Sequence, residues 1–113
     1  MGLPGAEGAV VEPRKLRDYL LSPSHPLGRF KAAFFARLGY TQEAWGVLSA
    51  DLRRHAESGE ASAAQAFRFG QKYEVTGILK GPAGKEAEVV SIWIILAGED
   101  FPRFVTAFPG ASS

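Results

Sequence analysis

The spacing of hydrophobic residues predicts three helices in the first half of the chain. The first begins at Pro13, where the missing backbone N–H costs nothing, and carries Leu16, Tyr19 and Leu20 at helical spacing. Pro23 stops it, because proline cannot continue the hydrogen-bond ladder of a helix. These positions predict a short helix with one apolar side.

The same pattern predicts two longer helices. The second takes Ser24 as its N-cap, has Pro26 in its first turn and stops at Gly39. The third ends at Gly59, with His55 stabilised by the helix dipole near that end. Their core-facing residues are expected to be Phe30, Phe34 and Leu38 on one helix and Trp45, Leu48 and Leu52 on the other.

After an Ala/Ser-rich spacer the period of the pattern changes to two, which is typical of strands. Residues 66–79, "AFRFGQKYEVTGIL", predict a strand with one buried face. Residues 87–98 are apolar on both faces, so they predict a central strand, and residues 103–108 predict a third. Pro- and Gly-containing turns join them, and residues 9–11 offer a further short edge strand.

We therefore expect an α+β fold, with N-terminal helices packed on a three- to four-stranded antiparallel meander. The 113 residues suit one hydrophobic core, hence a single domain over 1–113. Within it, residues 1–12 form an extended leader, 13–58 the helical part and 64–108 the sheet.

Composition narrows the classes of function. The net charge of +1 provides no global basic field, so a polyanion would have to meet a local patch. Without cysteine there is no disulfide or thiol nucleophile, and two histidines far apart disfavour a metal site. We find neither a secretory signal nor a membrane-length apolar run. We expect a soluble cytoplasmic monomer or homodimer without cofactor.

One short segment, "SPSHPLGRFK", brings together the residues best suited to chemistry. His25 can transfer a proton near neutral pH, and Arg29 and Lys31 follow it at a predicted helix start that favours anions. The structural alternative is a histidine that binds a backbone group, beside a solvated polar face. The coincidence of a proton carrier with two cations favours a phosphate site.

Polar residues on the predicted strands are weaker candidates. Tyr73 is more often a core residue than a catalytic one at such a position. Arg103 and Thr106 have an odd spacing, so they share a face of the sheet only if a bulge lies between them.

The order of the motifs resembles a bacterial family known as domain of unknown function 6883. The resemblance rests on "SPSHPLGRFKA", "FGQKY" and the run from Trp93 through "GEDFPR" to "VTA", and it extends over nearly the whole chain. Members of that family occur alone or at the C-terminal tip of large secreted toxins, which implies a toxin-like nuclease. The family implies a polar residue at position 30, where this chain has Phe30.

The order of helices and strands also resembles the ribonucleases that include barnase, EndoU, colicin and RelE toxins. That resemblance implies metal-independent RNA cleavage with His25, Lys31 and Thr106 as catalytic residues. It implies substrate binding by Arg29, Tyr73 and Arg103.

A second hypothesis comes from a different class of function. A protein with near-neutral charge and eight phenylalanines also suits a non-catalytic interaction module, paired with a small antitoxin-like protein from a neighbouring gene. Growth of a bacterial host that expresses the protein distinguishes the two hypotheses, because only an active toxin should slow growth.

Overall fold

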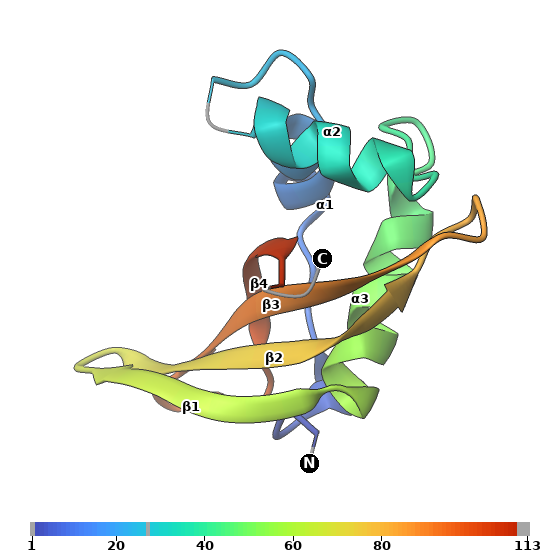
Figure 1. Ribbon diagram of the computed structural model, residues 1–113. Coiled ribbons are helices and arrows are strands. Elements are labelled where there is room, and N and C mark those ends of the chain that lie inside the picture. The colour runs from blue at the N-terminus through green and yellow to red at the C-terminus, as the bar shows by residue number, and fades with distance from the viewer. Residues whose placement is uncertain (1, 27, 111–113) are drawn as a thin grey trace.

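The computed structural model describes residues 2–26 and 28–110 and has helices followed by a four-stranded antiparallel sheet. The sheet is a meander in the order β1-β2-β3-β4, formed by Glu60–Phe67, Gly70–Lys80, Glu86–Leu96 and Arg103–Pro109. Helix α3 (Trp45–Ser58) packs against β2 and β3, while the shorter helices gather beside one end of α3 (Figure 1). The predicted α+β meander is confirmed.

The shorter helices differ in detail from the prediction. Helix α1 (Pro13–Lys15) continues directly into η2 (Leu16–Leu20), a single π-helical stretch. The next helix, α2, spans Arg29–Arg37, so it begins after Ser24 and Pro26 rather than around them. His25 therefore lies in the loop before α2 and not in its first turn. A 3₁₀ turn, η1 (Ala6–Gly8), interrupts the N-terminal segment.

The sheet begins earlier than the predicted boundary at residue 64. Strand β1 starts at Glu60, in the stretch interpreted as a spacer, and the predicted strand over 66–79 is broken by a turn at Arg68 and Phe69. Small side chains have little intrinsic strand preference, so pairing with β2 decides this conformation. The predicted edge strand at 9–11 is reduced to a parallel bridge between Val10 and Arg103.

One apolar core joins α3, η2 and the sheet. Its largest fully buried side chains include Trp93, Phe35 and the four leucines Leu16, Leu20, Leu48 and Leu52, beside Val75 and Val89. On α2 the buried positions are Ala32 and Phe35, whereas Phe30, predicted to face the core, is 72% exposed. The later start of α2 explains this difference, because the first residue of the predicted stripe lies at an open helix end.

A buried histidine connects α3 to the sheet. The His55 Nε2 lies 3.2 Å from the Gly77 carbonyl oxygen and 3.0 Å from that of Val89, so Nε2 carries the ring proton and donates. Its Nδ1 lies 3.0 Å from the Ser91 hydroxyl, which accepts a hydrogen bond from the Trp93 indole N–H. Burial lowers the pKa of His55. His55 is thus a core residue held by the sheet, and not a surface residue stabilised by the helix dipole.

Candidate functional site

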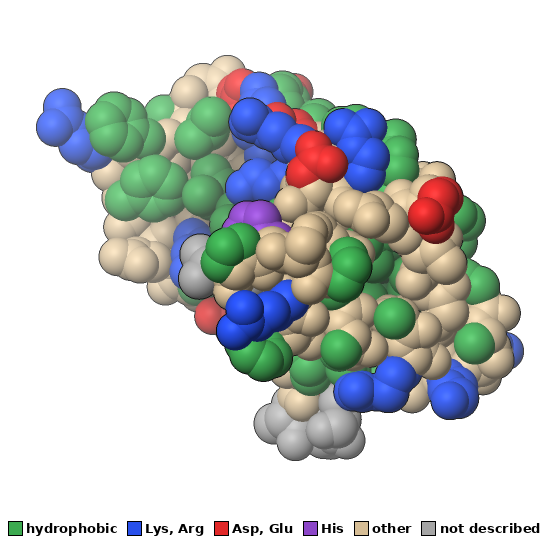
Figure 2. All heavy atoms as spheres, turned by 90° about the horizontal axis from the view of Figure 1, so that it is seen from above, with side chains coloured by type: hydrophobic (Ala, Val, Ile, Leu, Met, Phe, Trp, Pro, Cys, Tyr) green, Lys and Arg blue, Asp and Glu red, His purple; other side chains and the backbone are tan. Residues whose placement is uncertain are grey.

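A cleft of about 600 Å³ opens between α1, η2, the loop before α2 and strand β4. Figure 2 views the molecule from the side of α2 and shows Lys and Arg side chains near a histidine on this face. The cleft is lined by Arg14, Lys15, Asp18, Tyr19, His25, Val105 and Thr106. Elements far apart in the sequence therefore meet at one site.

Lys31 joins two of the lining residues. Its Nζ donates to the Tyr19 phenol oxygen at 3.0 Å and to the Thr106 Oγ1 at 3.1 Å, from the first turn of α2. The hydrogen bond from Lys31 is the main cause that lowers the pKa of Tyr19, and the positive charge of Lys15 adds to it. A tyrosine whose ionised form is stabilised in this way is a candidate for proton transfer.

His25 lies against Tyr19, with ring centroids 4.9 Å apart and an edge-to-face arrangement. Its Nδ1 accepts a hydrogen bond from the Gly28 backbone N–H at 3.1 Å. The neutral ring therefore carries its proton on Nε2, and the imidazole can act as an N–H donor. His25 therefore binds a backbone group, as the structural alternative expected, and it can still take part in chemistry through Nε2.

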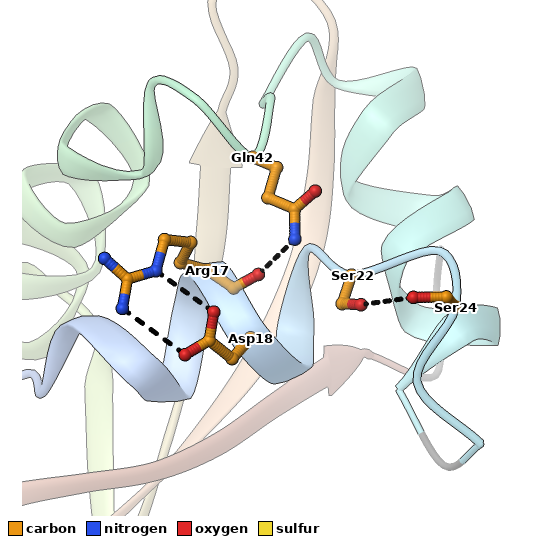
Figure 3. Close-up of polar contacts among 5 residues, drawn as sticks. All are labelled: Arg17, Asp18, Ser22, Ser24 and Gln42. Atoms are coloured by element: carbon orange, nitrogen blue, oxygen red, sulfur yellow. Dashed lines mark hydrogen bonds and ion pairs between the residues drawn. The ribbon is translucent and has the colours of Figure 1, made fainter.

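The charge of the cleft is mainly positive. Arg14 extends into solvent and pairs with Glu12 at 2.9 Å, and Lys15 is partly buried. The acidic lining residue, Asp18, pairs with Arg17 through two hydrogen bonds (Figure 3), and this contact lowers the pKa of Asp18. Arg17 offsets the charge of Asp18, and Glu12 offsets that of Arg14. The charge that remains at the cleft is that of Lys15 and Lys31, so the cleft suits an anion.

Polar contacts connect the loops around the cleft to η2. The Gln42 side-chain amide donates to the Arg17 backbone oxygen at 2.6 Å, which links the α2–α3 loop to η2 (Figure 3). In the loop before α2, the Ser22 and Ser24 hydroxyls lie 3.3 Å apart. These bonds help to hold the backbone that carries Tyr19 and His25.

The two cations predicted from the sequence to act together, Arg29 and Lys31, lie at different places in the structure. Lys31 reaches the cleft through Tyr19 and Thr106, whereas Arg29 is exposed, lies over the Phe30 ring at 4.8 Å and lines a different groove with Pro23. Phe30 is not among the residues that line the cleft. The exposed position of Arg29 follows from the late start of α2.

The two candidates on β4 share a face of the sheet. A register shift after Ile92 lets Thr106 pair with Ile92 and Arg103 pair with Ile94, so the bulge required by their odd spacing is present. Arg103 forms a forked ion pair with Glu99, with hydrogen bonds of 2.9 and 2.8 Å.

Tyr73 lies on the opposite face of the sheet. It is paired with Trp93, one position from the Ile92–Thr106 row, and its side chain packs against the core. The register therefore separates Tyr73 from the cleft.

Tyr19 is the residue that sequence reasoning did not select. Its spacing from Leu16 identified it only as part of an apolar helix side, and no local motif connects it with Lys31. The η2 turn exposes its hydroxyl to the cleft, which a pattern of apolar positions does not reveal.

Within residues 2–26 and 28–110, no group of three His, Cys, Asp or Glu side chains is arranged to hold a metal ion. No helix in the same ranges is long and apolar enough to cross a bilayer.

Comparison with protein families matches residues 2–111 to the domain of unknown function DUF6883. The chain belongs to this family. No match is found among curated proteins. A similar solved structure is titled contact-dependent growth inhibition toxin–immunity protein complex from Klebsiella pneumoniae 342. One chain of it aligns with a TM-score of 0.70 and 22% identity, over 89% of this chain and 99% of that chain. This similarity shows a shared fold for the DUF6883 domain.

Proposed function

We propose that this DUF6883 protein is a toxin-like, metal-independent endoribonuclease that uses the 2′-hydroxyl of its substrate as the nucleophile. The observation that carries the proposal is the contact of Lys31 with both Tyr19 and Thr106 in a cationic cleft next to His25. Its similarity to a chain from a toxin–immunity complex supports the toxin-like part of the proposal.

The proposed reaction gives a role to three residues, Tyr19, Lys31 and His25. The Tyr19 phenolate removes the 2′-hydroxyl proton while the 2′-oxygen attacks phosphorus and the bond to the 5′-oxygen breaks. The Lys31 ammonium protonates the departing 5′-oxygen, and the His25 Nε2–H donates to a phosphate oxygen. The products are a 2′,3′-cyclic phosphate and a 5′-hydroxyl. A proton then moves from Tyr19 to Lys31 along their 3.0 Å hydrogen bond, which restores both groups.

The test is cleavage of single-stranded RNA by purified protein in chelator, with the 2′-O-methylated strand as a substrate that cannot react. Tyr19→Phe and Lys31→Ala should each lower the rate on the order of a hundredfold or more, because each removes a proton-transfer group. His25→Ala should lower it by a similar factor through the lost donor to phosphate.

Arg29→Ala is the matched control, since Arg29 has the same charge as Lys31 and lines a different groove. It should retain activity within a few fold. Intact RNA after hours with concentrated wild-type protein would contradict the proposal, as would an unchanged rate in Tyr19→Phe.

The second candidate function is a protein-interaction module with a small antitoxin-like partner. The observation that favours it is Phe30, a large apolar side chain that is 72% exposed at the start of α2. Expression in a bacterial host separates the two functions. A ribonuclease toxin should slow growth, and Lys31→Ala should relieve the effect, whereas an interaction module should have no effect on growth.

A further inference from the structure

The sheet has a second face that continues away from the cleft. Helix α3 packs on the face that carries Val75 and Val89. Residues on the other face pair across three strands in two successive rows: Glu74–Ile92–Thr106, which borders the cleft, and Lys72–Ile94–Arg103 beyond it. The side chains of both rows therefore point to the same side of the sheet as the cleft, where Ile92 is buried and Glu74 is exposed.

The surface ends at the β1–β2 turn, where aromatic and basic side chains are exposed. Phe67 is 39% and Phe69 is 62% exposed, and the Arg68 guanidinium lies 5.1 Å from the Phe69 ring centroid. We call these three residues the aromatic tip. Exposed large apolar side chains at a turn contribute little to a core, so their placement suggests a binding role.

The β3–β4 turn lies beside the aromatic tip. The Ala97 N–H donates to the Phe69 carbonyl oxygen at 2.7 Å, and Gly70 pairs with Leu96. At the other end of the same turn, the Arg103 guanidinium lies 5.0 Å from the Phe101 ring centroid. Two arginine–aromatic pairs thus occupy the same end of the sheet.

Two cations on this surface, Lys72 and Arg68, lie along a path that runs from the cleft toward the tip. Glu99 offsets the charge of Arg103, whereas Lys72 and Arg68 have no ion pair among residues 2–26 and 28–110. Glu74 lies two residues from Lys72 on the same face of β2. A bound polyanion would therefore avoid Glu74 and pass Lys72 and Arg68.

We propose that single-stranded RNA lies along this face, with a base stacked on Phe69 and backbone phosphates near Lys72 and Arg68. Aromatic side chains stack on any base, and cations in a groove follow the backbone, which is how proteins bind single strands without sequence preference. The inference rests on the proposed ribonuclease function and adds a subsite for nucleotides beyond the scissile bond.

The length of the strand predicts which substrates use the subsite. From Ile92, beside Thr106, to Leu96, beside Gly70, the backbone covers four residues, or about 13 Å. A dinucleotide held in the cleft would leave the aromatic tip empty, whereas a longer strand would reach it.

The test measures binding of fluorescent 2′-O-methylated oligonucleotides of increasing length by anisotropy. These strands lack the nucleophile, so binding is recorded whether or not the protein cleaves RNA. Phe69→Ala should weaken binding of a dodecamer roughly tenfold and leave a dinucleotide unaffected, in keeping with the loss of one base stack. Phe69→Trp should restore the affinity. Lys72→Ala should reduce the salt dependence of binding.

Phe30→Ala is the matched control, because Phe30 is also an exposed phenylalanine beneath an arginine but lies on α2. A dodecamer affinity that is unchanged from wild type in Phe69→Ala, as it should be in Phe30→Ala, would overturn the inference. RNA cleavage that persists with that result would preserve the proposed function. A loss of binding in Phe69→Ala with no cleavage by wild type would overturn the ribonuclease reaction and support the binding face.

Discussion

At the scale of single residues, the chemistry of the cleft depends on how Lys31 affects Tyr19. The chain has three tyrosines. A hydrogen bond from Lys31 lowers the pKa of Tyr19, whereas burial, together with a hydrogen bond to Asp51, raises the pKa of Tyr40. The two phenols therefore respond to opposite environments within one small fold.

We predict that Tyr19 ionises at lower pH than Tyr40, and that Lys31→Gln removes this early step. The reason is that the amide of the substituted side chain would donate a neutral hydrogen bond, which stabilises a phenolate less than an ammonium does. Ultraviolet absorbance of tyrosinate during an alkaline titration measures both effects. Arg29→Gln is the control for loss of charge, and it should leave the early step in place. If Lys31→Gln and wild type titrate identically, Lys31 does not control Tyr19.

The same interaction predicts the direction of the pH dependence of cleavage. A phenolate base is active when deprotonated, so the rate should rise with pH through the lowered pKa of Tyr19. In Lys31→Gln the remaining activity should rise only at higher pH. A pH–rate profile of both proteins checks this, and a profile that falls with rising pH over the same range would argue against Tyr19 as the base.

At the scale of elements, the site depends on close contact between the start of α2 and η2. Gly28 directly precedes α2, and a Cβ at this position would overlap the Tyr19 backbone oxygen and lie 3.2 Å from its Cδ1. Glycine thus allows the backbone approach that brings Lys31 within reach of Tyr19.

We predict that Gly28→Ala destabilises the fold by roughly 1–3 kcal/mol, as expected when a close contact is overpacked. It should also weaken the effect of Lys31 on Tyr19 ionisation. Denaturant unfolding and the alkaline titration measure the two effects. Gly46→Ala in α3 is the control, since its Cβ would meet nothing within 4 Å, and it should stabilise the protein slightly. If Gly28→Ala matched Gly46→Ala in stability, the contact would not be required.

At the scale of the whole molecule, His55 connects the helical part to the sheet in its neutral form. Both carbonyls near its Nε2 need a donor, and its Nδ1 accepts from the Ser91 hydroxyl while Ser91 accepts from Trp93. A second ring proton would face the Ser91 hydroxyl and disrupt this arrangement. The core is therefore sensitive to acid at a position remote from the cleft.

We predict that stability falls as the pH drops below 6.5, the ordinary pKa of histidine. Burial lowers the pKa of folded His55, so below 6.5 the unfolded chain binds a proton that the folded chain does not. The loss approaches about 1.4 kcal/mol per pH unit and ends at the folded pKa. Denaturant unfolding from pH 7 to 5 measures it. His55→Gln should remove this slope, although the variant is less stable, and His25→Ala should keep it.

The pattern of apolar residues determined much of the fold. Leucine spacing identified η2 and α3, and Gly39 marked the end of α2 with its φ of +101°. A period-two run identified most of β2, and a run that is apolar on both faces identified β3. These features follow from local periodicity and backbone preference, which act over a few residues. The motif around His25 also identified the loop that borders the cleft.

Local pattern could not determine β1, because its alanine-rich segment becomes a strand only through pairing with β2. The start of α2 also depended on context, since Gly28 fits against Tyr19 from a different turn of the chain. That displacement exposed Phe30 and separated Arg29 from the cleft.

Some residues of the candidate site could be found from the sequence, and others only from the structure. The sequence by itself selected His25, Arg29 and Lys31 as residue types suited to phosphate chemistry, and the resemblance to ribonuclease toxins added Thr106. Only the tertiary structure added Tyr19, because the hydrogen bonds that lower its pKa come from Lys31 on α2 and Thr106 on β4. Lys31 is 12 residues from Tyr19 in the sequence, and Thr106 is 75 residues from Lys31. Hydrogen bonds and charge act through space over a few ångströms, and that proximity is a product of folding.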